Sequence, residues 1–286
     1  MKLSVVVISR NEGPWLRRTI DGLIATLPPD CEIVVVDDGS EDASADSLNC
    51  DRLRLIRSLG LGVARARNLG ALESTGDVIV FADAHLCFQP CWWQALAERA
   101  LRLGAGGVAP AVGDIDHPDR FGYGFTLDAP DLVPQWFQRY EDVPFQAPIV
   151  PGCCLAMSRA VFSRTGGFDP GLKSRGGIDA ETGVRFWLQG FENWVVPESK
   201  VWHLFRAAAP FPVRRPEVIH NRLRLAYLHF SPQRIETVRH ALAEDPAFEQ
   251  AERLAAGSDW PMRQKQLLAT RVHDDRWFFQ KFGISW

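Results

Sequence analysis

The first eighty residues alternate between short apolar runs and segments with helical periodicity. Leu3–Ile8 is a continuous run rich in β-branched residues, which is typical of a strand buried on both faces of a parallel sheet. Pro14–Leu27 follows with apolar residues at helical spacing, and Glu32–Val36 repeats the strand pattern. The same alternation continues with Leu53–Ile56, Val63–Leu72 and Asp77–Phe81. Because parallel strands need crossover connections, the pattern predicts an α/β fold with a mostly parallel sheet flanked by helices.

The middle of the chain is less regular. Between residues 104 and 151, glycine, proline and aromatic residues are frequent, and we expect this segment to pack over a site rather than to form a linker. After this segment the regular spacing of apolar residues returns. It predicts a strand at Cys153–Met157, a helix at Ala180–Gln189 and a strand at Asn193–Val196.

The sequence after Arg206 changes in composition. Residues 207–216 are rich in alanine and proline, which is typical of a loop, and residues 217–286 are mostly helical in pattern. We therefore predict one domain over residues 1–206, a lid or linker loop over 207–216, and a helical C-terminal extension over 217–286 that packs on the same domain.

Charge and composition exclude several classes of function. Thirty-two basic and thirty-five acidic residues give a net charge of −3, so no basic excess indicates general nucleic-acid binding. The longest apolar runs, Val5–Ile8 and Ile33–Val36, are far too short to cross a bilayer, and the N-terminus lacks signal-peptide features. The six cysteines show no zinc-type spacing. We expect a reduced, cytoplasmic protein without a transmembrane segment.

Two adjacent acids end the second predicted strand. Asp37 and Asp38 follow the buried run directly, and ligands of open α/β sheets bind at the carboxyl ends of strands. Adjacent carboxylates can accept hydrogen bonds from a base imide and from ribose hydroxyls. The alternative interpretation is a simple Asp-Gly turn.

A second group of polar residues has the composition of a metal site. Asp83 and His85 follow the strand Asp77–Phe81 at a spacing that turns both side chains to one side of an extended chain. A carboxylate with imidazole suits Mn²⁺ or a similar divalent ion better than Ca²⁺. His203, at the end of a distant strand-like segment, is a candidate third ligand. The alternatives are a polar strand end and a structural histidine.

A third candidate lies at the start of a predicted helix. Asp179 follows Gly176-Gly177-Ile178, where the helix dipole favours its ionised form. It either caps the helix or faces an acceptor. Phosphate-binding loops are not convincing, because Leu59–Gly62 lacks the third glycine of a dinucleotide fingerprint and no Walker or G-x-S-x-G motif occurs.

Taken together, these segments resemble a glycosyltransferase of the GT-A fold. The early motifs VVVISRNE, EIVVVDDGSED and GVARARNLGALESTGDVIVFADAH are similar to the large family-2 group. The later motifs APIVPGCCLAMSRAVFSRTGGFDPGL, RGGIDAETGVRFWLQG and VPESKVWHLFR are similar to the polypeptide N-acetylgalactosaminyltransferases. The resemblance extends from residue 3 to residue 227 and implies a GT-A (nucleotide-diphospho-sugar transferase) fold, with a Rossmann-like, mostly parallel sheet.

The resemblance also implies roles for residues at matching positions. Asp38, with Asp37, would bind uracil and ribose of a UDP-linked donor. Asp83, His85 and His203 would hold a divalent metal, Mn²⁺ first and Mg²⁺ second, against the diphosphate. The other positions predicted to bind the nucleotide or the donor are Asn11, Glu12, Arg67, Ala84, Gly152, Gly177 and Arg206, with the loop after Arg206 acting as a lid.

Some positions depart from the N-acetylgalactosaminyltransferase pattern. Arg175, Ile178 and Asp179 stand where those enzymes carry Trp, Glu and Asn, which argues against an N-acetylgalactosamine donor. Asp179 instead matches the catalytic base of inverting family-2 enzymes, so we predict inversion with Asp179 as the base and Glu181 as a second catalytic candidate.

Other functions stay open at this point. A retaining UDP-sugar-dependent peptide or protein transferase and a non-catalytic nucleotide-sugar binder are the alternatives. A nucleotidyltransferase would carry a glycine-rich basic loop, which residues 9–13 resemble only faintly. The acceptor is undefined, because aromatic residues suit peptides, glycans, lipids and natural products alike.

Overall fold

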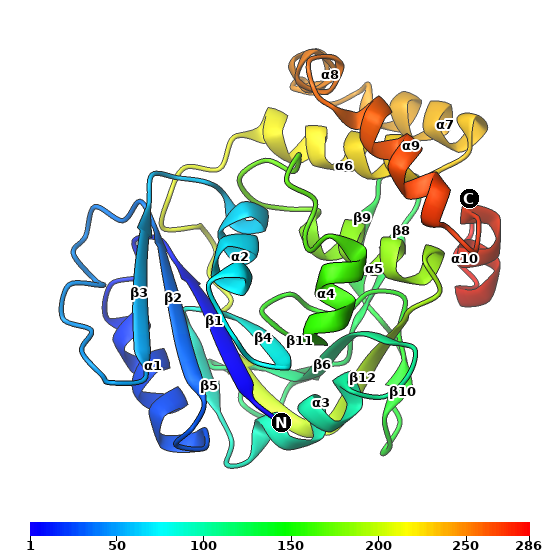
Figure 1. Cartoon of the computed structure of the whole chain (residues 1–286). Coiled ribbons are helices and arrows are strands. Elements are labelled where there is room, and N and C mark those ends of the chain that lie inside the picture. Colours follow the sequence, from blue (N-terminus) through cyan, green and yellow to red (C-terminus); the bar gives the residue numbers. More distant parts are fainter.

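Four parallel strands rich in valine and isoleucine form one half of a large sheet (Figure 1). The computed structural model describes residues 1–286. The strands are β1 (Leu3–Ser9), β2 (Glu32–Asp38), β3 (Leu53–Ser58), β4 (Val78–Asp83), β5 (Leu86–Phe88), β6 (Ala105–Asp114), β7 (Phe121–Gly122), β8 (Phe125–Asp128), β9 (Val133–Trp136), β10 (Phe145–Gln146), β11 (Cys154–Ser158) and β12 (Glu192–His203). The helices are α1 (Pro14–Thr26), α2 (Val63–Leu72), α3 (Trp92–Ala100), α4 (Arg159–Thr165), α5 (Ile178–Leu188), α6 (Arg215–His229), α7 (Pro232–Leu242), α8 (Phe248–Ala256), α9 (Trp260–Thr270) and α10 (Asp275–Phe282).

The order of the strands creates a place for a ligand. The sheet runs β10-β12-β6-β11-β4-β1-β2-β3, with β5 paired to β12 and β7 paired to β6. β1 pairs in parallel with β2 on one side and with β4 on the other, so the chain reverses its winding direction at β1. β12 is parallel to β6, and both run in the same direction as β4 because β11 lies antiparallel between β4 and β6. The carboxyl ends of β1, β2, β4, β6 and β12 therefore share one edge, and a reversal of this kind is where open α/β sheets bind ligands.

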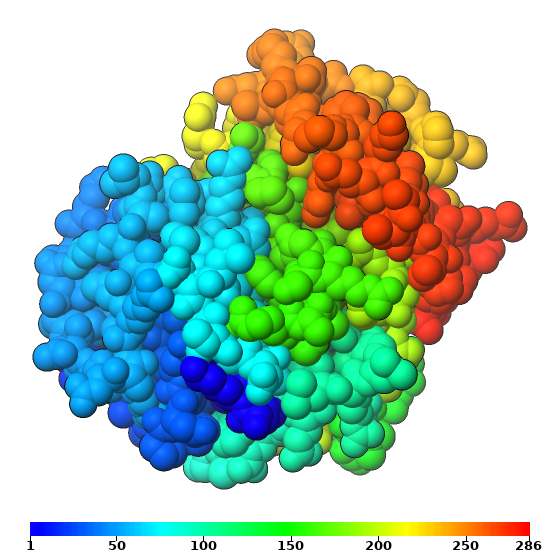
Figure 2. All heavy atoms as spheres, viewed as in Figure 1, coloured from blue at the N-terminus to red at the C-terminus, as the bar shows by residue number.

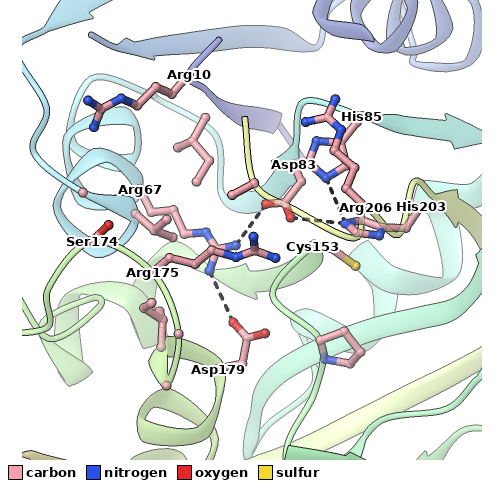
Figure 3. Close-up of a pocket in the computed structure, with 18 of the residues that line it drawn as sticks. Arg10, Arg67, Asp83, His85, Cys153, Ser174, Arg175, Asp179, His203 and Arg206 are labelled. Atoms are coloured by element: carbon pink, nitrogen blue, oxygen red, sulfur yellow. Dashed lines mark hydrogen bonds and ion pairs between the residues drawn. The ribbon is translucent and has the colours of Figure 1, made fainter. Parts of the chain in front are cut away.

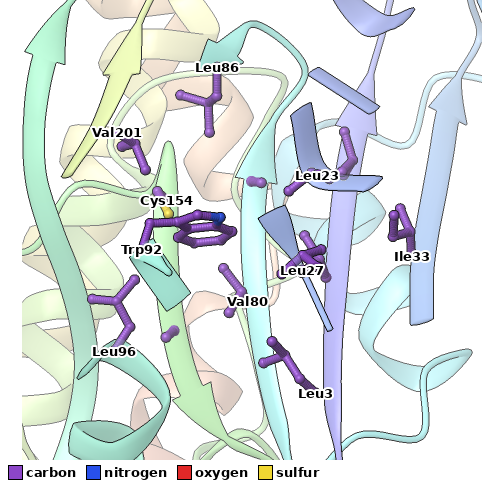
Figure 4. Close-up of a cluster of buried hydrophobic side chains, with 14 of the residues drawn as sticks. Leu3, Leu23, Leu27, Ile33, Val80, Leu86, Trp92, Leu96, Cys154 and Val201 are labelled. Atoms are coloured by element: carbon purple, nitrogen blue, oxygen red, sulfur yellow. The ribbon is translucent and has the colours of Figure 1, made fainter. Parts of the chain in front are cut away.

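Two hydrophobic clusters cover the two faces of the sheet. Val5 of β1 points to the face covered by α1 and α3, whereas Val6 points to the face covered by α2, α4 and α5. Figure 4 shows the first cluster, in which Trp92 of α3 lies beside Val80 and Cys154. Burial on both faces explains why the strands are apolar without interruption.

One strand at the centre of the sheet was not predicted from the sequence. Residues 104–151 showed no regular pattern, yet β6 lies between β11 and β12. Its sequence, AGGVAPAVGD, consists of small residues with low strand propensity. A Cβ on Gly106 would lie 3.0 Å from side-chain atoms of Phe186 and Phe191, and one on Gly107 would lie 2.9 Å from Val150. The small residues are thus required by the large side chains packed on either face.

The C-terminal helices form a third cluster at one end of the molecule. Figures 1 and 2 show α6–α10, in yellow to red, next to the green segment that includes α5. Trp187 of α5 packs its ring 5.1 Å from that of Phe282 and 6.2 Å from that of Trp277. The predicted helical C-terminal region is therefore present. No helix has the length and apolar character needed to cross a bilayer.

Trp92 provides a test of this packing. Its side chain is fully buried, and its Nε1 donates a hydrogen bond to Thr26 Oγ1 at 3.1 Å. Trp92→Ala should lower the free energy of unfolding by about 3–5 kcal/mol, because it leaves a large cavity. Leu103→Ala, at a fully exposed position, is the control and should change it by less than about 0.5 kcal/mol. Urea denaturation measures both, and equal stabilities of the two variants would contradict the packing described.

Candidate active site

The shared carboxyl edge of the strands borders a cleft of about 510 Å³ (Figure 3). It is lined by the ends of β1, β2, β4 and β12, by the start of α5, and by the loop that follows β12. This volume is in the range of sites that bind small molecules and cofactors.

Three predicted metal ligands meet on one side of this cleft. The ligating atoms of Asp83, His85 and His203 all lie within 4.8 Å of one another. Nε2 of His85 is 3.1 Å from Nε2 of His203, which is 3.6 Å from Oδ2 of Asp83. The cluster forms because β5 folds back onto the end of β12, with His203 opposite Leu86. The D-x-H motif and the distant histidine are thus brought together as predicted.

The environment of the cluster favours ligands that are ready to bind a cation. Burial opposes ionisation of Asp83, but the hydrogen bond from His203 and the charge of Arg67 hold the pKa of this carboxyl well below its usual value. Glu12 Oε2 lies 3.0 Å from Nδ1 of His85 and 2.8 Å from Nη2 of Arg206. A carboxylate on Nδ1 fixes the imidazole tautomer that leaves Nε2 free as a ligand. Glu12 therefore orients His85 and Arg206 together.

A buried arginine connects the cluster to Asp179. Arg67 of α2 donates from Nη2 to the Gly152 carbonyl at 2.7 Å and contacts Asp83 Oδ1 at 3.3 Å. Its Nη1 lies 3.5 Å from Asp179 Oδ1. Burial raises the pKa of Asp179 above its usual value, despite the opposing charge of Arg67. A carboxylate with a raised pKa is a better proton acceptor, and such an environment suits a general base.

Asp179 does not cap its helix. The N-cap of α5 is Gly177, in the left-handed region with φ of 77°, and no side chain accepts a capping hydrogen bond there. Asp179 lies in the first turn and faces the cleft beside Arg67 (Figure 3). Of the two interpretations of Asp179 from the sequence, the structure supports the one in which it faces the cleft.

Asp38 also lines the cleft, at the end of β2. Its carboxylate accepts hydrogen bonds from the backbone N–H groups of Leu61 and Gly62 at 2.6 and 2.8 Å, and from Ser58 Oγ at 2.7 Å. It therefore shapes the loop that leads into α2, in addition to facing the cleft. Ala84 and Gly177, both predicted to bind the donor, line the cleft too.

Three residues predicted to bind the donor are not part of the cleft lining: Asn11, Asp37 and Gly152. Asp37 turns away from Asp38, pairs with Arg57 and accepts from the Ser40 N–H at 3.1 Å. Asn11 accepts from the Glu41 N–H at 2.7 Å and thereby holds the turn after β2. These contacts of Asp37 and Asn11 do not support the prediction that both bind the donor, because successive side chains on a strand point to opposite faces and the side chain of Asn11 is used by backbone groups.

Glu181 is also not in the cleft. It is fully buried, with Oε1 2.8 Å from Arg185 Nε and 3.0 Å from His229 Nε2. Residues two positions apart on a helix do not share a face, so Glu181 and Asp179 diverge. Glu181 joins α5 to α6, and the structure does not support the predicted catalytic role.

Residues 4–166 match the family model described as Glycosyl transferase family 2. The chain belongs to this family. Among curated proteins, polypeptide N-acetylgalactosaminyltransferase 10 of Homo sapiens is 30% identical over 278 residues, covering 85% of this chain and 45% of the relative. Polypeptide N-acetylgalactosaminyltransferase 15 of Homo sapiens is 31% identical over 248 residues, covering 77% of this chain and 39% of the relative. The chain spans less than half the length of these two relatives.

Solved structures show that this family-2 chain has the GT-A fold. GalNAc-T7, solved with UDP, GalNAc and Mn²⁺, matches with a TM-score of 0.79 and 21% identity, covering 99% of this chain and 56% of that one. The mannosyltransferase PcManGT from Pyrobaculum calidifontis, solved with GDP-Man and Mn²⁺, matches with a TM-score of 0.51 and 19% identity, covering 94% and 85%. The fold class predicted from the sequence is confirmed.

The cleft of this family-2 member contains further residues that the sequence did not single out as site residues. Arg10, Arg175, Arg222 and Cys153 all line it. Arg175 was noted in the sequence only as a departure from the family pattern. Single arginines such as Arg10 and Arg222 leave no sequence pattern, so the structure is needed to place them in the cleft. The aromatic segment contributes Phe125, Leu132, Pro134 and Trp136 to the lining, as expected of a segment that packs over a site.

Gly152 lies directly against the side chains of Arg67 and Asp179. A Cβ there would overlap with the carboxylate of Asp179 and would lie 2.7 Å from Nη1 of Arg67. Gly152→Ala should therefore displace both side chains and lower the rate of sugar transfer or donor hydrolysis by about 10²-fold, as expected of an approximately 1 Å displacement in an active site.

The control for this variant is Gly257→Ala, where a new Cβ has no neighbour nearer than 3.6 Å. Circular dichroism should show both variants folded. Full activity of Gly152→Ala would show that the close approach of Arg67 and Asp179 is not needed.

Proposed function

We propose that this glycosyltransferase moves a sugar from a nucleoside-diphosphate donor to a hydroxyl-bearing acceptor with the help of a divalent metal. The observation that carries the proposal is the convergence, in one cleft, of the Asp83–His85–His203 cluster and the half-buried Asp179. The first group has the composition of a metal site, and the second has the properties of a base. Arg67 lies between them and contacts both carboxylates.

The residues of the cluster fit Mn²⁺. One carboxylate and two imidazoles form a mixed oxygen and nitrogen donor set, which suits Mn²⁺ better than Mg²⁺, since Mg²⁺ prefers oxygen ligands. GalNAc-T7 and PcManGT were both solved with Mn²⁺, which agrees with this choice. When bound, the ion would neutralise the diphosphate as the leaving group departs. Glu12 would hold His85 in the required tautomer and Arg206 near the phosphates.

The donor is proposed to be UDP-linked. Asp38 lies at the end of β2 in the cleft lining, where the uracil and ribose would bind, and its carboxylate keeps acceptor capacity beyond the three hydrogen bonds it already receives. GalNAc-T7 was solved with UDP, in agreement with this donor class. Arg206 and the loop after β12 border the same side of the cleft and would cover the bound donor.

Asp179 is proposed to accept the proton of the acceptor hydroxyl, which would give inversion at the anomeric carbon. Its raised pKa and its place in the cleft support this role. Gly152 lets Arg67 approach closely, and Arg67 orients the Asp179 carboxylate.

A second candidate function is supported by the comparisons. The two human relatives, at 30% and 31% identity, are polypeptide N-acetylgalactosaminyltransferases. A retaining transfer of N-acetylgalactosamine to a polypeptide is therefore the alternative. The substitutions Arg175, Ile178 and Asp179 on the cleft side favour the first proposal.

The metal proposal is tested by removing ligands. Asp83→Ala and His203→Ala should abolish the Mn²⁺-dependent binding of UDP and the Mn²⁺-dependent hydrolysis of UDP-sugars, because the diphosphate loses its counter-charge. Titration calorimetry with UDP, with GDP as a second titrant, measures binding and base preference. His240→Ala, at an exposed position in α7, is the control. Wild-type activity that persists in chelator would contradict the proposal.

The base is tested by one isosteric change. Asp179→Asn keeps size and shape but removes proton acceptance, so turnover should fall by about 10²-fold or more while UDP affinity stays the same. Asp21→Asn, on the exposed face of α1, is the matched control. The coupling constant of the anomeric proton in the product should show inversion. A retained configuration with full turnover of Asp179→Asn would favour the second candidate.

A further inference from the structure

Charged residues are not balanced within the cleft. Five arginines and four carboxylates line it, although the whole chain carries a net charge of −3. A divalent metal adds two positive charges, and the diphosphate of a nucleotide sugar brings about two negative ones, so they nearly cancel. A net positive charge is left in the cleft when metal and donor are both bound.

The excess positive charge comes from those arginines that have no acidic partner. Arg67 is paired with Asp83 and Asp179, and Arg206 is paired with Glu12. Arg175 and Arg222, in contrast, have no carboxylate within ion-pair distance, and their guanidinium groups form no hydrogen bond within the protein. The remaining lining arginine, Arg10, lies over the ring of Phe211 at 5.5 Å.

One buried side chain connects the segments that carry Arg175 and Arg222. Asn221 is fully buried in α6, and its Nδ2 donates to the carbonyls of Lys173 and Gly176 at 2.8 and 2.7 Å, while its Oδ1 accepts from the Lys173 N–H at 2.8 Å. The loop that carries Arg175 is thereby fixed to the helix that carries Arg222. Figure 3 shows Arg175 extending from this loop toward the centre of the cleft.

The surroundings of Arg222 separate it from the proposed diphosphate site. Asp131, in the turn between β8 and β9, is near enough to act on Arg222 but forms no ion pair with it. Burial and the charge of Arg215 lower the pKa of Arg222, and the charges of Asp131 and Asp245 oppose this only in part. Arg222 thus faces the cleft on the side of the β8–β9 hairpin, whereas the Asp83–His85–His203 cluster lies at the ends of β4, β5 and β12.

We propose that Arg175 and Arg222 bind an anionic group, a carboxylate or a phosphate, carried by the sugar of the donor or by the acceptor. A planar guanidinium can donate two parallel N–H···O hydrogen bonds to a carboxylate or to a phosphate, so either anion can be bound in bidentate fashion. The inference rests on the proposed function, because the metal and the diphosphate must occupy the other side of the cleft. It assigns a charged substrate to a family-2 member whose human relatives are N-acetylgalactosaminyltransferases.

The first arm of the test concerns the donor. Calorimetry with Mn²⁺ compares UDP-glucose with UDP-glucuronic acid, which differ only at C6. If the donor carries the anion, wild type should bind UDP-glucuronic acid at least about tenfold more tightly than UDP-glucose, the effect of a charge-assisted hydrogen bond. Arg175→Gln and Arg222→Gln should each remove most of this preference and leave the affinity for UDP unchanged.

The second arm concerns the acceptor. Protein loaded with Mn²⁺ and UDP is titrated with glucuronate, with glucose 6-phosphate and with glucose. If the acceptor carries the anion, the two charged sugars should bind at least about tenfold more tightly than glucose, and both variants should lose this difference. Arg102→Gln removes the same charge from an exposed position near the opposite edge of the sheet and should behave as wild type in both arms.

Three results would overturn the inference. The first is no preference for charged over neutral sugars in either arm, and the second is a preference that both variants keep. The third is a loss of UDP affinity in Arg175→Gln and Arg222→Gln, which would assign these arginines to the diphosphate. UDP binding by wild type without any charge preference overturns this inference alone. Failure of UDP to bind wild type overturns the proposed function, and this inference with it.

Discussion

The site depends on one buried arginine side chain that lies between two carboxylates. Arg67 contacts Asp83 and Asp179 and donates to the carbonyl of Gly152. Without it, two carboxylates beside the same glycine would repel each other, and one would take up a proton. These contacts also join segments that are distant in the sequence: α2 and β4 from the first half, and the start of α5 from the second. Asp83 of the proposed metal cluster and the proposed base Asp179 are therefore both positioned by a single guanidinium.

Much of the fold could be predicted because its strands are continuous apolar runs. Val63–Leu72 was predicted as a helix with the observed bounds, whereas β6 was missed because its small residues are required by tertiary packing, which leaves no local pattern. The site shows the same limit. Asp83, His85 and His203 could be found because strand ends and a short motif mark them. Glu181 was assigned to the site because it lies close to Asp179 in the sequence. Residues two positions apart on a helix point to different faces, however, so the two side chains diverge.

The comparisons and the cleft give complementary information on function. The fold is close to that of GalNAc-T7, with a TM-score of 0.79, yet the residues on the sugar side of the cleft depart from the N-acetylgalactosaminyltransferase pattern. A fold constrains where a ligand binds, and the site residues decide which ligand it is. In this chain Asp83, His85 and His203 keep the composition of a metal site, while Arg175 and Arg222 add positive charge to the same cleft. These residues support the proposal of a glycosyltransferase whose substrate differs from that of the N-acetylgalactosaminyltransferases.

The central claim is that one metal ion at Asp83, His85 and His203 binds the diphosphate of the donor. A crystal structure of the protein with Mn²⁺ and UDP, with data collected at the manganese absorption edge, tests it most directly. The account predicts one anomalous peak within coordination distance of these three side chains and of the UDP phosphates, with Asp179 left free of the metal. A peak elsewhere, or UDP bound in the cleft without a metal at this cluster, would contradict it.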